Sequence, residues 1–124
     1  MHVVLVAAGG AVGSVARYLV GVWSVRVLGL AFPWGTLIVN LVGSFAIGLL
    51  AELIARRFNA SMELRLLLVT GFLGGFTTFS AFSLDTIALY ERGQVTTAAV
   101  YVLASVVLSL AATFAGMAAI RRLL

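Results

Sequence analysis

The sequence has few charged residues, no cysteine and a single proline. Only 10% of its 124 residues are charged and 63% are hydrophobic, so too few polar side chains are present to cover a surface in water. The absence of cysteine excludes thiol catalysis and thiolate metal sites. All cationic side chains are arginine, with a net charge of +4, which is ordinary for the flanks of membrane spans. We therefore expect a membrane protein that binds no nucleic acid.

Long apolar runs divide the chain into four expected membrane spans. A hydrocarbon core about 30 Å thick needs roughly 20 helical residues per crossing, and such runs cover residues 3–25, 34–55, 65–90 and 95–119. The first run lacks the basic residues that begin a signal peptide, so we interpret it as a span. These runs predict an all-α, multi-pass protein of the cell membrane, with one transmembrane domain over residues 1–124.

Polar residues recur at every fourth position in the second and fourth spans, which places each set on one helix face. The two sets are Thr36, Asn40, Ser44, Gly48 and Glu52, and Thr97, Tyr101, Ser105, Ser109 and Thr113. In lipid, such groups are costly unless they face protein or water. Two interpretations of these polar faces stay open. They could hydrogen-bond between helices, at about 0.6–2 kcal/mol per contact, or they could line a path for an ion.

The first span contains a charged residue, Arg17, about fifteen residues from its start. A guanidinium group at that depth costs at least about 2.5 kcal/mol unless it finds an anion, a carbonyl group or water. Arg17 could pair with backbone carbonyls or with Asp85, or it could draw anions into an aqueous vestibule. Gly9 and Gly13, one turn apart and just before it, predict close packing of this helix.

The third span contains a helix-disfavouring run near its centre. Gly71, Gly74 and Gly75 precede Thr77 and Thr78, and each glycine costs roughly 1 kcal/mol relative to alanine. We therefore expect the helix to break here. Irregular backbone at membrane depth occurs only where it is buried in protein or lines a cavity, and there its carbonyl groups can bind a cation.

Two phenylalanines follow this run. Phe79 and Phe82 lie three residues apart on one helix face, beside Ser80. Aromatic faces usually serve packing. An aromatic edge, however, carries the positive end of the ring quadrupole, so two rings with their edges toward a path could contact an anion without the tight binding of a full positive charge.

Three ordered segments resemble the Fluc family of fluoride channels, also known as CrcB proteins. They are GGAVGSVARY from residue 9, GTLIVNLVGSFAIG from residue 35 and GGFTTFSAFS from residue 74. The resemblance implies an antiparallel, dual-topology dimer of four-helix subunits with two fluoride pores. It also implies a third helix broken at mid-membrane and a structural sodium ion at the dimer interface, held by backbone carbonyls.

The resemblance also implies roles for single residues by their motif positions. Asn40, Phe79 and Phe82 would line the fluoride pore, and Arg17 would be the first-helix arginine at the vestibule. The sodium ligands would be the carbonyl oxygens of Gly74 and Thr77. The remaining pore candidates are the fourth-helix residues Tyr101, Ser105 and Ser109, together with Thr36 and Ser80.

Two positions depart from the family pattern. The family often has threonine where Ala81 stands, so one hydroxyl group near the pore is missing. It usually has glutamate where Asp85 stands, and aspartate keeps the charge but has a shorter reach.

The function implied is passive fluoride export, which protects a cell against fluoride toxicity. Neutral donors suit an anion that must bind and also leave, and the spans offer no carboxylate relay for proton coupling. No catalytic constellation is present, so we do not expect an enzyme. A small multidrug transporter would need an acidic residue in the first helix, and residues 3–25 contain none. A non-conducting membrane assembly subunit stays open as a second alternative.

The arginines are distributed unevenly between the two expected membrane sides. One side would hold Arg56, Arg57, Arg65, Arg121 and Arg122, and the other only Arg26 and Arg92. Arginines near span ends favour the cytoplasmic side, so we expect both termini to be cytoplasmic. A chain that inserts in both orientations should carry nearly equal numbers of arginines on the two sides. The antiparallel partner could therefore be a second copy or an oppositely oriented paralogue.

Overall fold

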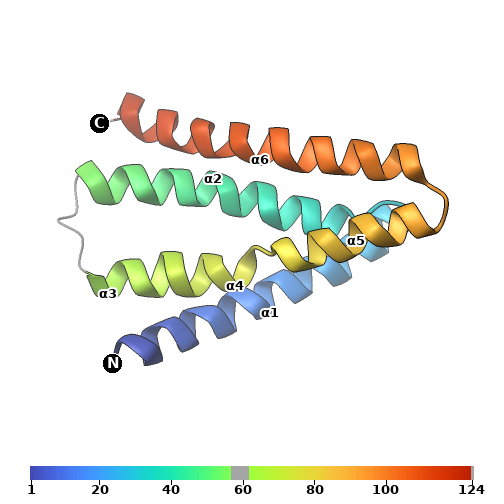
Figure 1. Cartoon of the computed structure of the whole chain (residues 1–124). Helices are drawn as coiled ribbons and strands as arrows, with labels where there is room; N and C mark the ends of the chain where they lie inside the picture. The colour runs from blue at the N-terminus through green and yellow to red at the C-terminus, as the bar shows by residue number, and fades with distance from the viewer. Residues whose placement is uncertain (57–61, 124) are drawn as a thin grey trace.

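The computed structural model describes residues 1–56 and 62–123, which form a bundle of long helices with both termini at one end (Figure 1). Helix α1 covers His2–Leu28, α2 covers Trp34–Arg56 and α6 covers Val95–Leu123. The third long segment covers Met62–Glu91. At 1.5 Å per residue, 23 residues already reach about 35 Å, and all four segments are apolar enough to cross a membrane. The prediction of four long apolar helices is confirmed, while Arg57 lies outside the described residues.

The third segment is built from several pieces. A turn of α3 (Met62–Arg65) leads into the π-helical stretch η1 (Leu66–Leu73) and the short α4 (Gly74–Phe76). Thr77 and Thr78 are extended, and α5 (Phe79–Glu91) follows. The Thr78 hydroxyl accepts a hydrogen bond from the Ala81 N–H at 3.1 Å, as expected of a helix N-cap. Helical conformation is therefore interrupted at Thr77 and Thr78.

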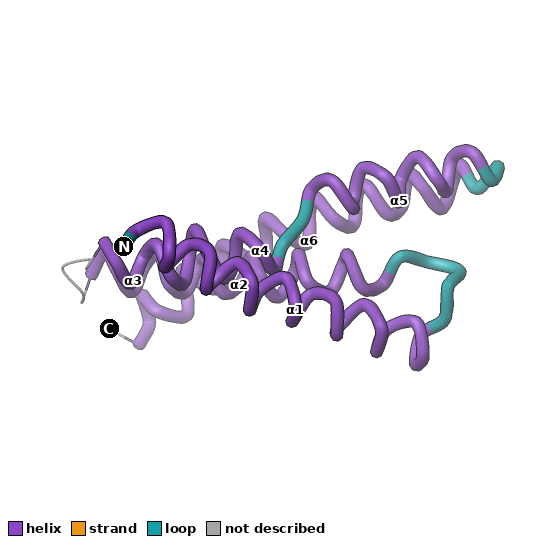
Figure 2. The backbone as a smooth tube through the Cα atoms, turned by 90° about the horizontal axis from the view of Figure 1, so that it is seen from below, coloured by secondary structure: helices purple, strands orange, loops and turns teal. Residues whose placement is uncertain are grey.

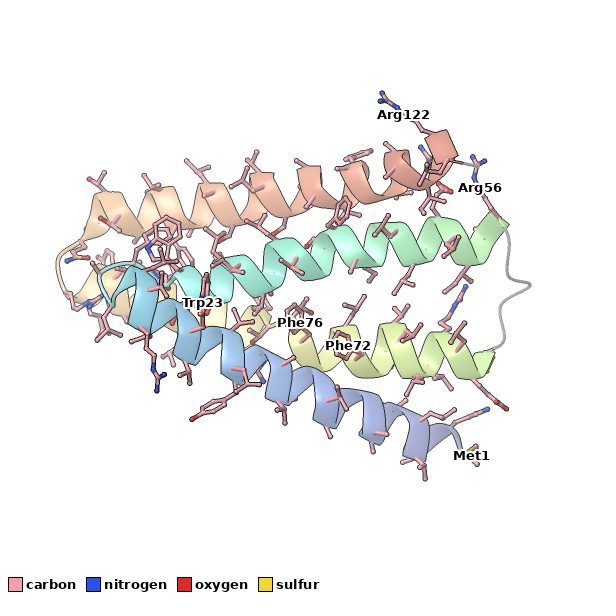
Figure 3. The ribbon with its side chains drawn as sticks, turned by 180° about the vertical axis from the view of Figure 1, so that it is seen from behind. Met1, Trp23, Arg56, Phe72, Phe76 and Arg122 are labelled. Atoms are coloured by element: carbon pink, nitrogen blue, oxygen red, sulfur yellow. The ribbon has the colours of Figure 1, made fainter. Side chains whose placement is uncertain are left out.

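The helices pack as two close pairs, α2 with α6 and α1 with η1 and α4. Glycine makes this approach possible. A Cβ on Gly48 would overlap the Thr113 carbonyl oxygen, and one on Gly13 would overlap the Phe72 carbonyl oxygen. The glycines of the first span therefore serve close packing, as predicted from their spacing. Phe72 and Phe76 project from the third segment toward the interior (Figure 3), with ring centroids 5.8 Å apart.

The main cluster of buried apolar side chains lies toward the end of the bundle opposite the termini. Its members are Leu37 of α2, Leu89 of α5, and Ala98 and Tyr101 of α6. At this end the α1–α2 turn and the α5–α6 turn diverge (Figure 2). Elsewhere many large apolar side chains are exposed, as expected for helices whose outer faces contact lipid or another subunit.

Candidate functional site

A cavity of about 470 Å³ lies between α2, α6 and the interrupted third segment. Its polar lining includes Asn40 and Ser44 from α2 and Ser105 and Ser109 from α6, so both polar stripes face the same space. The rest of the lining is Gly43, Ile47, Val69, Leu73, Gly74, Thr77, Thr78, Phe79, Phe82, Val106 and Leu110. None of these described lining residues is charged. The cavity is therefore a neutral space with several hydrogen-bonding groups.

The side chain of Asn40 is bound to the interruption of the third segment. Its Nδ2 donates to the Thr78 carbonyl oxygen at 3.0 Å, and its Oδ1 accepts from the Thr78 N–H at 2.9 Å. In a continuous helix the Thr78 N–H would bond to the carbonyl four residues earlier. Asn40 supplies the replacement partner; its amide group has two N–H donors, one is used by the Thr78 carbonyl oxygen, and the residue lines the cavity.

Ser105 presents a buried hydroxyl group to this space. The residue is 7% exposed, and among the described residues its Oγ has no hydrogen-bond partner. A buried hydroxyl without a partner costs about 1–3 kcal/mol. A group in this state is available to a ligand that enters the cavity.

An aromatic row leads from the cavity wall, at Phe79 and Phe82, to the buried Tyr101. The Phe79 and Phe82 ring centroids are 5.5 Å apart, and those of Phe82 and Tyr101 are 5.2 Å apart, both with tilted planes. Phe79 is 78% exposed within a single chain. One end of the row is therefore open, and the other is packed against the buried Tyr101.

Asp85 accepts hydrogen bonds from two of the hydroxyl groups predicted to line the pore. Its Oδ2 accepts from the Thr36 hydroxyl at 2.8 Å and from the Tyr101 hydroxyl at 3.2 Å. Aspartate therefore reaches both partners despite being shorter than glutamate. Thr36 and Tyr101 are not among the lining of the 470 Å³ cavity in the described chain, and in this structure their protons are directed to Asp85.

Arg17 finds a backbone partner, one of the possibilities that its sequence position left open. Its Nε donates to the Gly75 carbonyl oxygen at 3.0 Å, just before the interruption. Arg17 also lines a second cavity, of about 740 Å³, together with Arg26, Ser14, Tyr18 and Thr36. This second cavity is positively charged, unlike the first.

The structure thus brings together part of the predicted site. Asn40, Ser105, Ser109, Phe79, Phe82, Gly74 and Thr77 all line the neutral cavity. Ser80 does not, and its hydroxyl lies 3.2 Å from that of Thr78. Thr78 itself was not predicted as a site residue, although a threonine that follows a glycine run and precedes a helix is a signal for an N-cap.

Comparison with known proteins identifies close relatives. The family described as CrcB-like protein, Camphor Resistance (CrcB), matches residues 4–117. The chain is 68% identical over 119 residues to a fluoride-specific ion channel FluC of Rhizobium etli strain CIAT 652, covering 96% of this chain and 95% of the relative. The FluC of Agrobacterium fabrum is 66% identical over 123 residues, covering 99% and 98%. That of Chelativorans sp. is 58% identical over 116 residues, covering 94% and 93%.

Proposed function

The chain belongs to the CrcB-like protein family, and on this basis we propose that it is a fluoride-selective channel that exports fluoride passively across the cell membrane. Its relatives at 58–68% identity are named fluoride-specific ion channels. Channels are not enzymes, which agrees with the prediction that this chain has no catalytic activity.

One observation supports the proposal most strongly, namely the neutral cavity into which the Ser105 hydroxyl projects without a partner. Fluoride is small and strongly hydrated, so a pore must replace its water with hydrogen-bond donors. It must also avoid a site too strong to leave. The free amide proton of Asn40 and the hydroxyls of Ser105 and Ser109 meet both requirements.

The aromatic row would complete this pathway. Phe79 and Phe82 would present their electropositive ring edges to fluoride as it passes. The hydroxyls of Thr36 and Tyr101 donate to Asp85 in this structure. They would donate to fluoride only after they release the Asp85 carboxylate. Ser80, whose hydroxyl lies beside that of Thr78, would contact fluoride at an end of this pathway. Arg17 and its charged cavity would raise the local concentration of anions.

We place the interruption at Thr77 and Thr78 at mid-membrane, where the third span would cross as two half-helices. Within the described chain, no backbone N–H donates to the Thr77 carbonyl oxygen, and no cluster of three acidic or histidine side chains offers a metal site. Hard cations prefer oxygen ligands. Carbonyl oxygens of Gly74 and Thr77 from two subunits would hold a sodium ion that stabilises the dimer.

The functional unit would be an antiparallel dimer. The 78% exposure of Phe79 suits a residue that is covered by a second subunit. Both termini lie at the end that carries Arg56, Arg65, Arg121 and Arg122 (Figure 1), so this chain would insert mainly with its termini in the cytoplasm. Its partner is a second copy or an oppositely oriented paralogue.

Fluoride efflux from liposomes tests the proposal. The protein is purified through a tag on this chain and reconstituted into vesicles loaded with fluoride or chloride. The vesicles should release fluoride and retain chloride. Ser105→Ala removes the unpaired hydroxyl without leaving another group unsatisfied, so it should reduce the efflux rate while the protein stays folded. A folded dimer that releases no fluoride would favour an assembly subunit, and proton-coupled uptake of cationic drugs would favour a multidrug transporter.

A further inference from the structure

Two arginines bind one carboxylate at the end of the bundle that carries both termini, and a third arginine follows one of them in the chain. Glu52 is 8% exposed. Its Oε1 accepts from the Nε of Arg121 at 2.6 Å, and its Oε2 accepts from the Nε of Arg56 at 3.4 Å. Arg122 follows Arg121 in the chain and is exposed. Figure 3 shows Arg56 and Arg122 projecting from the same end of α2 and α6. We refer to Arg56, Arg121 and Arg122 as the arginine cluster.

The ion pairs fix two guanidinium groups and leave much of their binding capacity unused. Both bonds to Glu52 involve Nε, and no bond to a terminal amino group of Arg56 or Arg121 is found among the described residues. Their side chains are 46% and 51% exposed. One carboxylate balances only one of three guanidinium charges, so the cluster retains a charge of +2.

The position of the cluster indicates which anion it meets. Arg56 is the last residue of α2, while Arg121 and Arg122 lie in the last turn of α6. Both helices are long enough to cross a membrane. Their ends therefore lie at the level of the lipid headgroups. At the other end of the bundle, Arg26 and Arg92 are balanced in number by Asp85 and Glu91. The end that carries the termini therefore has an excess of positive charge that the opposite end lacks.

From these observations we propose that the arginine cluster, two of whose members are held in place by Glu52, binds the phosphate group of an anionic membrane lipid. A guanidinium group presents its N–H donors in a planar fork that matches phosphate oxygens. Holding two such groups by their Nε atoms orients their terminal amino groups before the lipid arrives, which reduces the entropy lost on binding. The site is separate from the neutral cavity and does not depend on fluoride conduction.

Native mass spectrometry of the full-length protein tests this site. The protein is released from micelles that contain equal amounts of phosphatidylglycerol and phosphatidylcholine, and the lipids that stay bound are counted. We expect retention of phosphatidylglycerol. Arg122→Gln breaks no contact among the described residues and should weaken phosphatidylglycerol binding about fivefold, since each basic residue near the surface contributes on the order of 1 kcal/mol.

A matched set of variants separates this site from general charge attraction. The triple variant Glu52→Gln/Arg56→Gln/Arg121→Gln lowers the net charge by one, leaves no unpaired buried carboxylate, and should lose most of the phosphatidylglycerol preference. Arg26→Gln also lowers the net charge by one, at the opposite end, and should keep it. Equal retention by the wild type, the triple variant and Arg122→Gln would overturn the proposal, as would an equal loss in Arg26→Gln. Competition by soluble glycerol phosphate at equal concentration would show a phosphate site that is not specific to lipid.

Discussion

The side-chain amide of Asn40 bonds to both backbone polar groups of Thr78, donating to its carbonyl oxygen at 3.0 Å and accepting from its N–H at 2.9 Å. The side chain thereby satisfies backbone groups that the interruption of the third segment leaves without helical partners. One amide proton remains for a ligand in the cavity. Asn40 consequently links the shape of the interruption to the donors of the proposed fluoride pathway.

Asn40→Asp should abolish fluoride flux. An aspartate can still accept from the Thr78 N–H. However, it cannot donate to the Thr78 carbonyl oxygen, and it places a negative charge beside that oxygen and the cavity. Two like charges 4 Å apart repel by about 4 kcal/mol at an effective dielectric constant of 20, which lowers anion occupancy nearly a thousandfold. Asn40→Ser, which adds no charge, should retain part of the flux. Unchanged efflux in the aspartate variant would reduce Asn40 to a structural role.

Phe82→Ile should give a folded protein with greatly reduced fluoride flux. Isoleucine keeps apolar volume but lacks the electropositive ring edge, and it also loses the contacts of Phe82 with Tyr101 and Phe79. Phe72→Ile is the matched control, because Phe72 stacks on Phe76 and is absent from the cavity lining. Normal efflux in both variants would show that the rings serve packing alone.

Gly48→Ala should destabilise the protein by about 1–3 kcal/mol, because the new methyl group would overlap the Thr113 carbonyl oxygen across the α2–α6 contact. The control is Gly21→Ala, where a Cβ meets nothing within 4 Å and helix propensity favours alanine by about 1 kcal/mol. Unfolding in detergent, followed by circular dichroism, compares the two. Equal stability of the two variants would contradict this packing.

Replacing Gly74 by valine tests the sodium proposal. Within one chain, a Cβ at Gly74 would lie 3.8 Å from the Val69 carbonyl oxygen, an ordinary contact. The subunit should therefore fold, while crowding near the proposed ion weakens the dimer. The measurement is the dimer fraction by light scattering, in sodium and in N-methylglucamine. The wild-type dimer should weaken without sodium, and a dimer insensitive to sodium would argue against the ion.

Much of the helical architecture could be predicted because lipid requires long apolar runs. The four-residue spacing likewise predicted that Asn40 and Ser44 share a face, and both line the cavity with Ser105. The binding of Asp85 to Thr36 and Tyr101 could not be predicted, because three helices bring those residues together and no local pattern records their crossing. The π-helical form of Leu66–Leu73 was missed as well, since its apolar residues show no pattern that separates a π-helix from an α-helix. The roles assigned to Phe79, Gly74 and Thr77 stay predictions.

The reversal potential of the reconstituted protein tests the central claim most directly. The assembly, purified from its host through a tag on this chain, is placed in a planar bilayer under a tenfold fluoride gradient with chloride, sodium and pH equal on both sides. Passive fluoride-selective conduction predicts a reversal potential of about 59 mV in magnitude, unchanged when a pH gradient is imposed. A reversal potential near zero, or one that follows the pH gradient, would contradict the account.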